Sequence, residues 1–152
     1  MTPRTARVIS ESVTEAVGAA RGRDAVGFGA AAGRLSTVDP SRVALVLGWA
    51  VRAVLEELHP DGLDGEDLRA VLTGCATAAG TWESEVDPSV LLVVLTGALG
   101  LSDPDEQPAL PPAAVARNAT LLLAHLLGER PPAPYLDAAF AELERAETIE
   151  MP

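Results

Sequence analysis

Aromatic and strand-forming residues are scarce in this chain. Only five of the 152 residues are aromatic, although 48% are hydrophobic. The core must therefore be built mainly from alanine, valine and leucine. Alanine and leucine favour helices, and segments rich in threonine, tyrosine or isoleucine are hard to find. These shortages argue against a sheet and predict an all-α fold.

Cysteine is also almost absent, because Cys75 is the single one. An internal disulfide and a cysteine-based metal site are thereby excluded. The neighbours Gly74, Ala76 and Ala78 predict that this thiol is buried in a tightly packed helix face. We expect neither a metal nor a cofactor.

Lysine is missing altogether, so all eleven basic residues are arginine and the formal net charge is −11. Residues 1–34 carry five arginines against three acids, whereas residues 35–152 carry six against nineteen. An acidic body repels a phosphate backbone, which argues against nucleic-acid binding. We expect one helical domain over residues 1–152, with a slightly basic N-terminal segment and an acidic body.

Long apolar runs are lacking as well. Arg52 and Thr96 interrupt the longest ones, which fall short of the ~20 residues that a membrane span needs. The first residues are polar and lack the apolar region of a secretion signal. We therefore expect no membrane partner and a cytoplasmic location.

Two matching helix starts dominate what the sequence does contain. Val38-Asp39-Pro40-Ser41 returns as Val86-Asp87-Pro88-Ser89, and each is followed by a nearly unbroken apolar run. Aspartate is a preferred N-cap and proline a preferred first helical residue, so both stretches predict the start of a helix.

The whole chain predicts a compact bundle of about six helices. They are expected at about 5–22, 40–58, 64–80, 87–100, 112–127 and 135–147. The glycine- and alanine-rich piece 24–35 lacks the preceding strand and the G-K-[S/T] of a nucleotide loop. We expect it to permit close helix packing or a break.

A shift of 48 residues aligns the two matching helix starts. The same shift pairs further residues, namely Pro60 with Pro108, Arg69 with Arg117, and Gly80 with Gly128. These matches predict a duplicated helical hairpin, with copies at about 38–80 and 86–128. Two copies are fewer than a solenoid needs, so the architecture stays a bundle.

Polar residues interrupt two of the apolar helices. Arg52 follows Trp49 by three residues, while Arg117 and His125 lie in the helix expected at 112–127. A buried arginine or histidine needs a partner, because an unpaired one is costly. Two interpretations stay open: these residues reach solvent or a carboxylate at the bundle edge, or the four line a ligand pocket. The ligand would then be a small apolar, aromatic or anionic molecule.

The acidic residues do not form a recognisable site. The acidic linker 56–67 lacks the spacing of a calcium loop, and its residues fit a helix end followed by a cap at Asp64. Glu83 and Glu85, beside Trp82, are expected to be solvated. No nucleophile–base arrangement is legible, so no catalytic residue is predicted.

Three hypotheses about function follow. The helices at 40–58, 87–100 and 113–127 are apolar on more sides than one monomer readily covers, which favours a non-catalytic interaction or assembly protein. Its partner would be a second copy in a homodimer, or another protein. The alternatives are a carrier or tailoring enzyme with a small molecule between helices, and an acidic inhibitor of immunity type that neutralises a basic partner.

Overall fold

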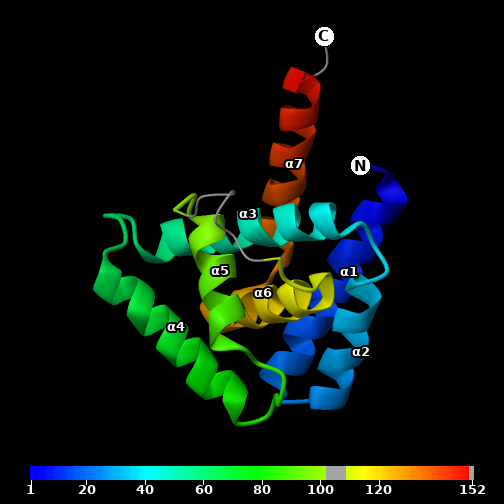
Figure 1. The fold of residues 1–152 in the computed structure, drawn as a ribbon. Coiled ribbons are helices and arrows are strands. Elements are labelled where there is room, and N and C mark those ends of the chain that lie inside the picture. Colours follow the sequence, from blue (N-terminus) through cyan, green and yellow to red (C-terminus); the bar gives the residue numbers. More distant parts are fainter. Residues whose placement is uncertain (102–108, 151–152) are drawn as a thin grey trace.

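The computed structural model describes residues 1–101 and 109–150. Over these ranges the chain forms seven α-helices and no strand, so the all-α prediction is confirmed. In chain order they are α1 (Pro3–Arg21), α2 (Ala25–Leu35), α3 (Pro40–Leu58), α4 (Gly65–Gly80), α5 (Pro88–Ala98), α6 (Pro112–Leu127) and α7 (Ala133–Glu150) (Figure 1). None of these described helices is both long and apolar enough to cross a membrane.

The predicted count of about six helices is wrong, because the glycine- and alanine-rich segment forms a helix of its own, α2. The carboxylate of Asp24 caps this helix by accepting a hydrogen bond from the Gly27 N–H at 3.0 Å. A Cβ at Gly27 would clash with the Asp24 Oδ2, so a larger residue there would require the capping side chain to shift. Arg23, with a φ of 54°, turns the chain between α1 and α2. The small residues thus support a cap and a turn that composition alone did not reveal.

The predicted helix caps are confirmed. Asp39 and Asp87 each accept a hydrogen bond, at 2.9 Å, from the backbone N–H of the serine two residues later. Asp64 caps α4 through a reciprocal pair of hydrogen bonds with Asp67. The bond from the Asp67 N–H lowers the pKa of Asp64, because it favours the charged carboxylate. Three of the seven helices therefore start at an aspartate that the sequence marks.

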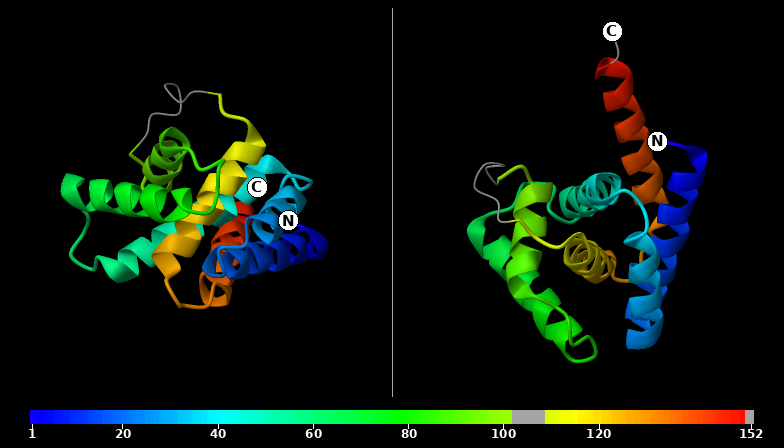
Figure 2. Two further views of the ribbon diagram at one scale, coloured as in Figure 1. Left: turned by 90° about the horizontal axis from the view of Figure 1, so that it is seen from below. Right: turned by 45° about the vertical axis from the view of Figure 1, so that its right-hand side comes forward.

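Helix α6 lies at the centre of the bundle. It contacts α1, α2, α3, α4 and α5, and ten of its sixteen residues are buried. Helices α4 and α5 lie on one side of it and α1 and α2 on the other (Figures 1 and 2). A helix surrounded in this way needs apolar residues on most of its faces. One monomer therefore accounts for the apolar character of α6 without a partner.

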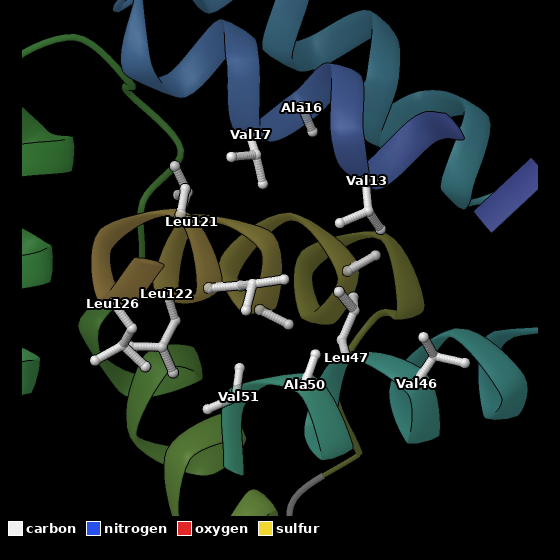
Figure 3. Close-up of a cluster of buried hydrophobic side chains, with 14 of the residues drawn as sticks. Val13, Ala16, Val17, Val46, Leu47, Ala50, Val51, Leu121, Leu122 and Leu126 are labelled. Atoms are coloured by element: carbon white, nitrogen blue, oxygen red, sulfur yellow. The ribbon is translucent and has the colours of Figure 1, made fainter. Parts of the chain in front are cut away.

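The main core lies where α6 passes between α1 and α3 (Figure 3). It is built from small and medium aliphatic side chains, among them Val13, Val17, Leu47, Ala50, Val51, Leu121, Leu122 and Leu126. The one hydroxyl in this part of α6, on Thr120, donates to the Ala116 carbonyl at 2.7 Å and so needs no other partner. The core of this region is thus formed by aliphatic side chains rather than by aromatic ones.

Helix α7 packs against α3. Its buried residues include Leu136, Ala139 and Leu143, and Phe140 on the same helix is half-buried. Near its C-terminal end, Glu147 forms ion pairs with the N-terminal ammonium of Met1 and with Arg42. The last helix is thereby tied to the first residue of the chain and to the start of α3.

The duplicated hairpin stays a prediction. Helix α5 packs against α6, whereas α3 packs mainly against α6 and α7, and α4 packs against α5 and α6. The feature that the segments 38–80 and 86–128 share in the structure is their equivalent aspartate–proline cap.

Candidate functional site

An apolar groove of about 500 Å³ lies between α3, α5 and α6. Its described wall is mainly aliphatic and includes Leu45, Trp49, Val93, Val94, Ala98 and Val115. Arg52 is the one charged residue among the described residues of the wall, which contains no carboxylate. We refer to this feature as the α3–α5 groove. It joins apolar surface to a single guanidinium.

The groove arises from the pattern of α3. One face of α3 is buried in the core, through residues such as Val46, Leu47 and Val51. Leu45, Trp49 and Arg52, at i, i+4 and i+7, form a stripe on another face of the same helix. Leu45 remains 49% exposed and Trp49 remains 36% exposed. A Cβ at Gly48 would meet only open space, so the glycine between them deepens the groove.

Trp49 and Arg52, two of the four predicted ligand-binding residues, lie together at the groove. The guanidinium carbon of Arg52 lies 5.6 Å from the centroid of the Trp49 ring, in the range of a cation–π interaction. The same side chain donates from Nε to Glu56 at 3.0 Å. Arg52 is thus held at the groove and still exposes part of its charge to solvent.

Arg117 lies elsewhere, on the face of α6 that meets α2 and the α4–α5 connection. Its Nη1 is 3.4 Å from the carboxylate of Glu83, and its Nη2 is 3.1 Å from that of Glu85. Its guanidinium carbon lies 5.9 Å from the centroid of the Phe28 ring. Glu83 is only 4% exposed, so the prediction that both carboxylates are solvated is wrong for this one. Arg117 therefore neutralises a buried carboxylate, which is the bundle-edge interpretation of this residue.

Asn118 secures the same connection. Its Oδ1 accepts a hydrogen bond from the Asp87 N–H at 2.9 Å, and its Nδ2 donates to the Ala114 carbonyl at 2.9 Å. The side chain is buried and both ends of its amide are satisfied. Together, Arg117 and Asn118 fix the start of α5 and so one wall of the α3–α5 groove.

His125 lies two turns further along α6 and faces α4. Its Nε2 would be 3.1 Å from a Cβ at Gly74, so the glycine allows the imidazole to approach that helix. The ring lines a second, smaller pocket, together with Arg21, Arg23 and Trp82. Partial burial lowers the pKa of His125, because desolvation disfavours the imidazolium. The four predicted residues consequently do not share one pocket.

Cys75 is buried, as predicted. Burial raises the pKa of its thiol to about 12. Nucleophilic cysteines need the thiolate, which this environment disfavours. The residue therefore serves packing on α4.

The His125 environment predicts a pH dependence of stability. The pKa of this histidine is lower in the folded chain than in the unfolded chain, so the unfolded state takes up the proton first as the pH falls. The stability associated with the neutral ring is present above about pH 6.5 and is lost below it. We expect His125→Gln to flatten the decline in the urea midpoint between pH 7.5 and 5.5. His59→Gln is the matched control and should show the same slope of urea midpoint against pH as the parent chain. Equal slopes in the parent chain and in His125→Gln would contradict the assignment of this pH dependence to His125.

The described residues offer binding surface more clearly than reactive groups. No three histidine, cysteine or carboxylate side chains of residues 1–101 and 109–150 gather where they could hold a metal ion. The α3–α5 groove supplies apolar area with one cation, which suits an apolar protein surface or an apolar anion. Comparisons with protein-family models, curated proteins and solved structures found no match for this chain.

Proposed function

We propose that this chain is an assembly protein that forms a homodimer through the α3–α5 groove. The observation that supports it is the exposed apolar surface of α3 and α5. Leu45 and Trp49 on α3 are exposed beside the apolar wall that α5 supplies through Val93 and Val94. Contiguous apolar surface of this kind normally marks an interface.

Charge favours a second copy at this face over other parts of the surface. Two chains that each carry a net charge of −11 repel one another. The described wall of the groove contains no carboxylate, so the acidic charge of each copy is lower there, and the one charged wall residue, Arg52, already has a carboxylate partner in Glu56. A two-fold axis would place each groove against the other, the commonest way for a homo-oligomer to close.

The shape of the surface fits such a self-complementary contact. Leu45 and Trp49 border the hollow at Gly48, so the ridge of one copy can enter the hollow of the other. Tryptophan and arginine are enriched at the energetic centres of interfaces, and Arg52 beside Trp49 provides both.

Leu45→Glu tests this proposal. We expect the parent chain to be a dimer at micromolar concentration by light scattering. The substitution would place an unpaired carboxylate on each side of the axis and weaken the dimer at least about 100-fold. Val26→Glu is the matched control, because Val26 is 85% exposed on α2 and outside the groove. A parent chain that stays monomeric, or a Leu45→Glu variant that dimerises like Val26→Glu, would overturn the proposal.

A second candidate function is the binding of a small apolar carboxylate in the same groove. The volume of about 500 Å³ lies in the usual range for ligand pockets, and Arg52 supplies a cation beside the Trp49 ring. A saturable rise of the melting midpoint with an aromatic or fatty acid, lost in Arg52→Gln, would favour it. The same result on a monomeric parent would replace the homodimer by a binding protein.

A further inference from the structure

The second pocket lies at the C-terminal end of α4, whereas the linker from α3 joins the N-terminal end of that helix. It has a volume of about 170 Å³, and its walls come from the ends of α1 and α4 and from the C-terminal half of α6. Figures 1 and 2 show α4 on one side of α6 and the α1–α2 pair on the other. The side chains that carry polar groups into its described lining are Arg21, Arg23, Cys75, Trp82 and His125.

The charge of this lining is the reverse of that of the chain. The sequence has 22 acidic residues against eleven arginines, yet the described lining contains two arginines, one histidine and no carboxylate. Arg21 is held in place because its guanidinium donates to the carbonyls of Gly128 and Arg130. The ion pairs formed within the described chain engage other arginines and leave the guanidinium of Arg23 without a carboxylate.

The backbone at Arg23 gives an independent reason to look for a ligand. Its φ of 54° makes it the one non-glycine residue of the described chain in the left-handed region. Glycine is the usual residue at this position after a helix, because a side chain is strained there. Strained non-glycine residues concentrate at binding sites. Arginine therefore occupies a position at which the backbone favours glycine.

His125 completes the set of donors. Gly74 lets the imidazole lie against α4, at the edge of the pocket. Partial burial lowers the pKa of this ring. An anion beside it would favour the imidazolium, whose two N–H groups both donate.

We infer that Arg21, Arg23 and His125 form a binding site for a small oxyanion of the sulfate or phosphate type. The volume corresponds to roughly five or six water molecules, at about 30 Å³ for each. That is room for a tetrahedral anion or for a single phosphoryl group, and too little for a nucleotide. The site is independent of the proposed homodimer, because it shares no described lining residue with the α3–α5 groove.

Titration calorimetry with sodium sulfate tests the site in the chain of residues 1–152. Sodium chloride at equal ionic strength is the reference, and sulfate keeps its charge between pH 5.5 and 7.5. We expect one sulfate per chain and roughly tenfold tighter binding at pH 5.5 than at pH 7.5. The reason is that the protonated His125 binds the anion more strongly than the neutral ring does. The other groups that face His125 are Arg21, Arg23 and Cys75, and none of these changes charge in that range.

Arg23→Gly separates binding from folding. Glycine relieves the backbone strain at this position, so the melting midpoint should hold or rise by about 2 °C. Sulfate binding should weaken at least tenfold all the same. His125→Gln should remove the pH dependence of the binding. Arg69→Gln, which makes the same charge change on an exposed part of α4, should bind sulfate like the parent.

Two results would overturn the inference. One is a parent chain that gives no more heat with sulfate than with chloride. The other is equal sulfate affinity in Arg23→Gly and Arg69→Gln. If sulfate binds as expected, inorganic phosphate and a sugar phosphate distinguish a site for the free ion from one for a phosphoryl group.

Discussion

Replacing Arg117 with alanine is expected to lower the free energy of unfolding by about 3 kcal/mol at pH 7. The substitution would leave the carboxylate of Glu83 buried without its cation, and an uncompensated buried charge is costly. The estimate lies at the lower end for a broken buried pair, because Arg117 is partly exposed and Glu83 still accepts from the Glu85 N–H at 3.1 Å. Urea unfolding, followed by circular dichroism, gives the value.

The loss should depend on which partner is removed. Glu83→Gln leaves an amide that can still accept hydrogen bonds, and Arg117 keeps its contact with Glu85, so its effect should be clearly smaller. Arg34→Ala breaks an exposed pair with Glu15 and is the control, with an expected effect below about 1 kcal/mol. Equal losses in Arg117→Ala and Arg34→Ala would show that the pair has no structural role.

Phe28→Ala is expected to lower the free energy of unfolding by about 4 kcal/mol. The Phe28 side chain is fully buried, and its ring packs edge-on against Trp82, with centroids 5.4 Å apart and planes at 85°. Arg117 lies over the same ring. One substitution would therefore open a cavity and remove support from both the aromatic pair and the guanidinium.

Fluorescence and unfolding measure this effect together. In a Trp49→Phe background, the remaining emission comes from Trp82 and should shift to the red in Phe28→Ala, since water gains access to the indole. Val26→Ala, on the exposed side of the same helix, should change the stability by no more than about 0.5 kcal/mol. A stable Phe28→Ala variant with unshifted emission would mean that α2 is not docked through this ring.

Local signals explain why most of the fold was predictable. Helix starts at Asp39, Asp64 and Asp87 depend on a cap and the residues next to it, all within one turn. The pairing of Trp49 with Arg52 is also local, because residues three apart on a helix are neighbours. The extra helix α2 was missed because its composition resembles a loop, and its signal, Asp24 before Gly27, is a single weak cap.

The remaining features depend on which helices meet. From sequence alone, Arg117 was expected either to reach solvent or a carboxylate at the bundle edge or to line a ligand pocket, and Glu83 was noted as a member of an acidic pair. Nothing local places Glu83 inside the protein, because its burial results from the α4–α5 connection folding back onto α6. The same holds for α6. Its apolar faces suggested an interface with a partner, because the sequence does not show that five other helices of the same chain cover them. Arg117 and His125 meet different neighbours for this reason, although they share one helix.

The central place of α6 also has a consequence for synthesis on the ribosome. Helices α1 and α2 are made first and pack against each other, yet much of the surface that they bury is covered by α6, about 100 residues later in the chain. At the usual rate of synthesis, about 5–20 residues per second, this apolar surface stays exposed for roughly 5–20 s until α6 has been synthesised. During this interval the nascent chain is open to chaperones and to other nascent chains. Truncation before Pro112 should therefore yield an aggregating fragment rather than a smaller folded domain.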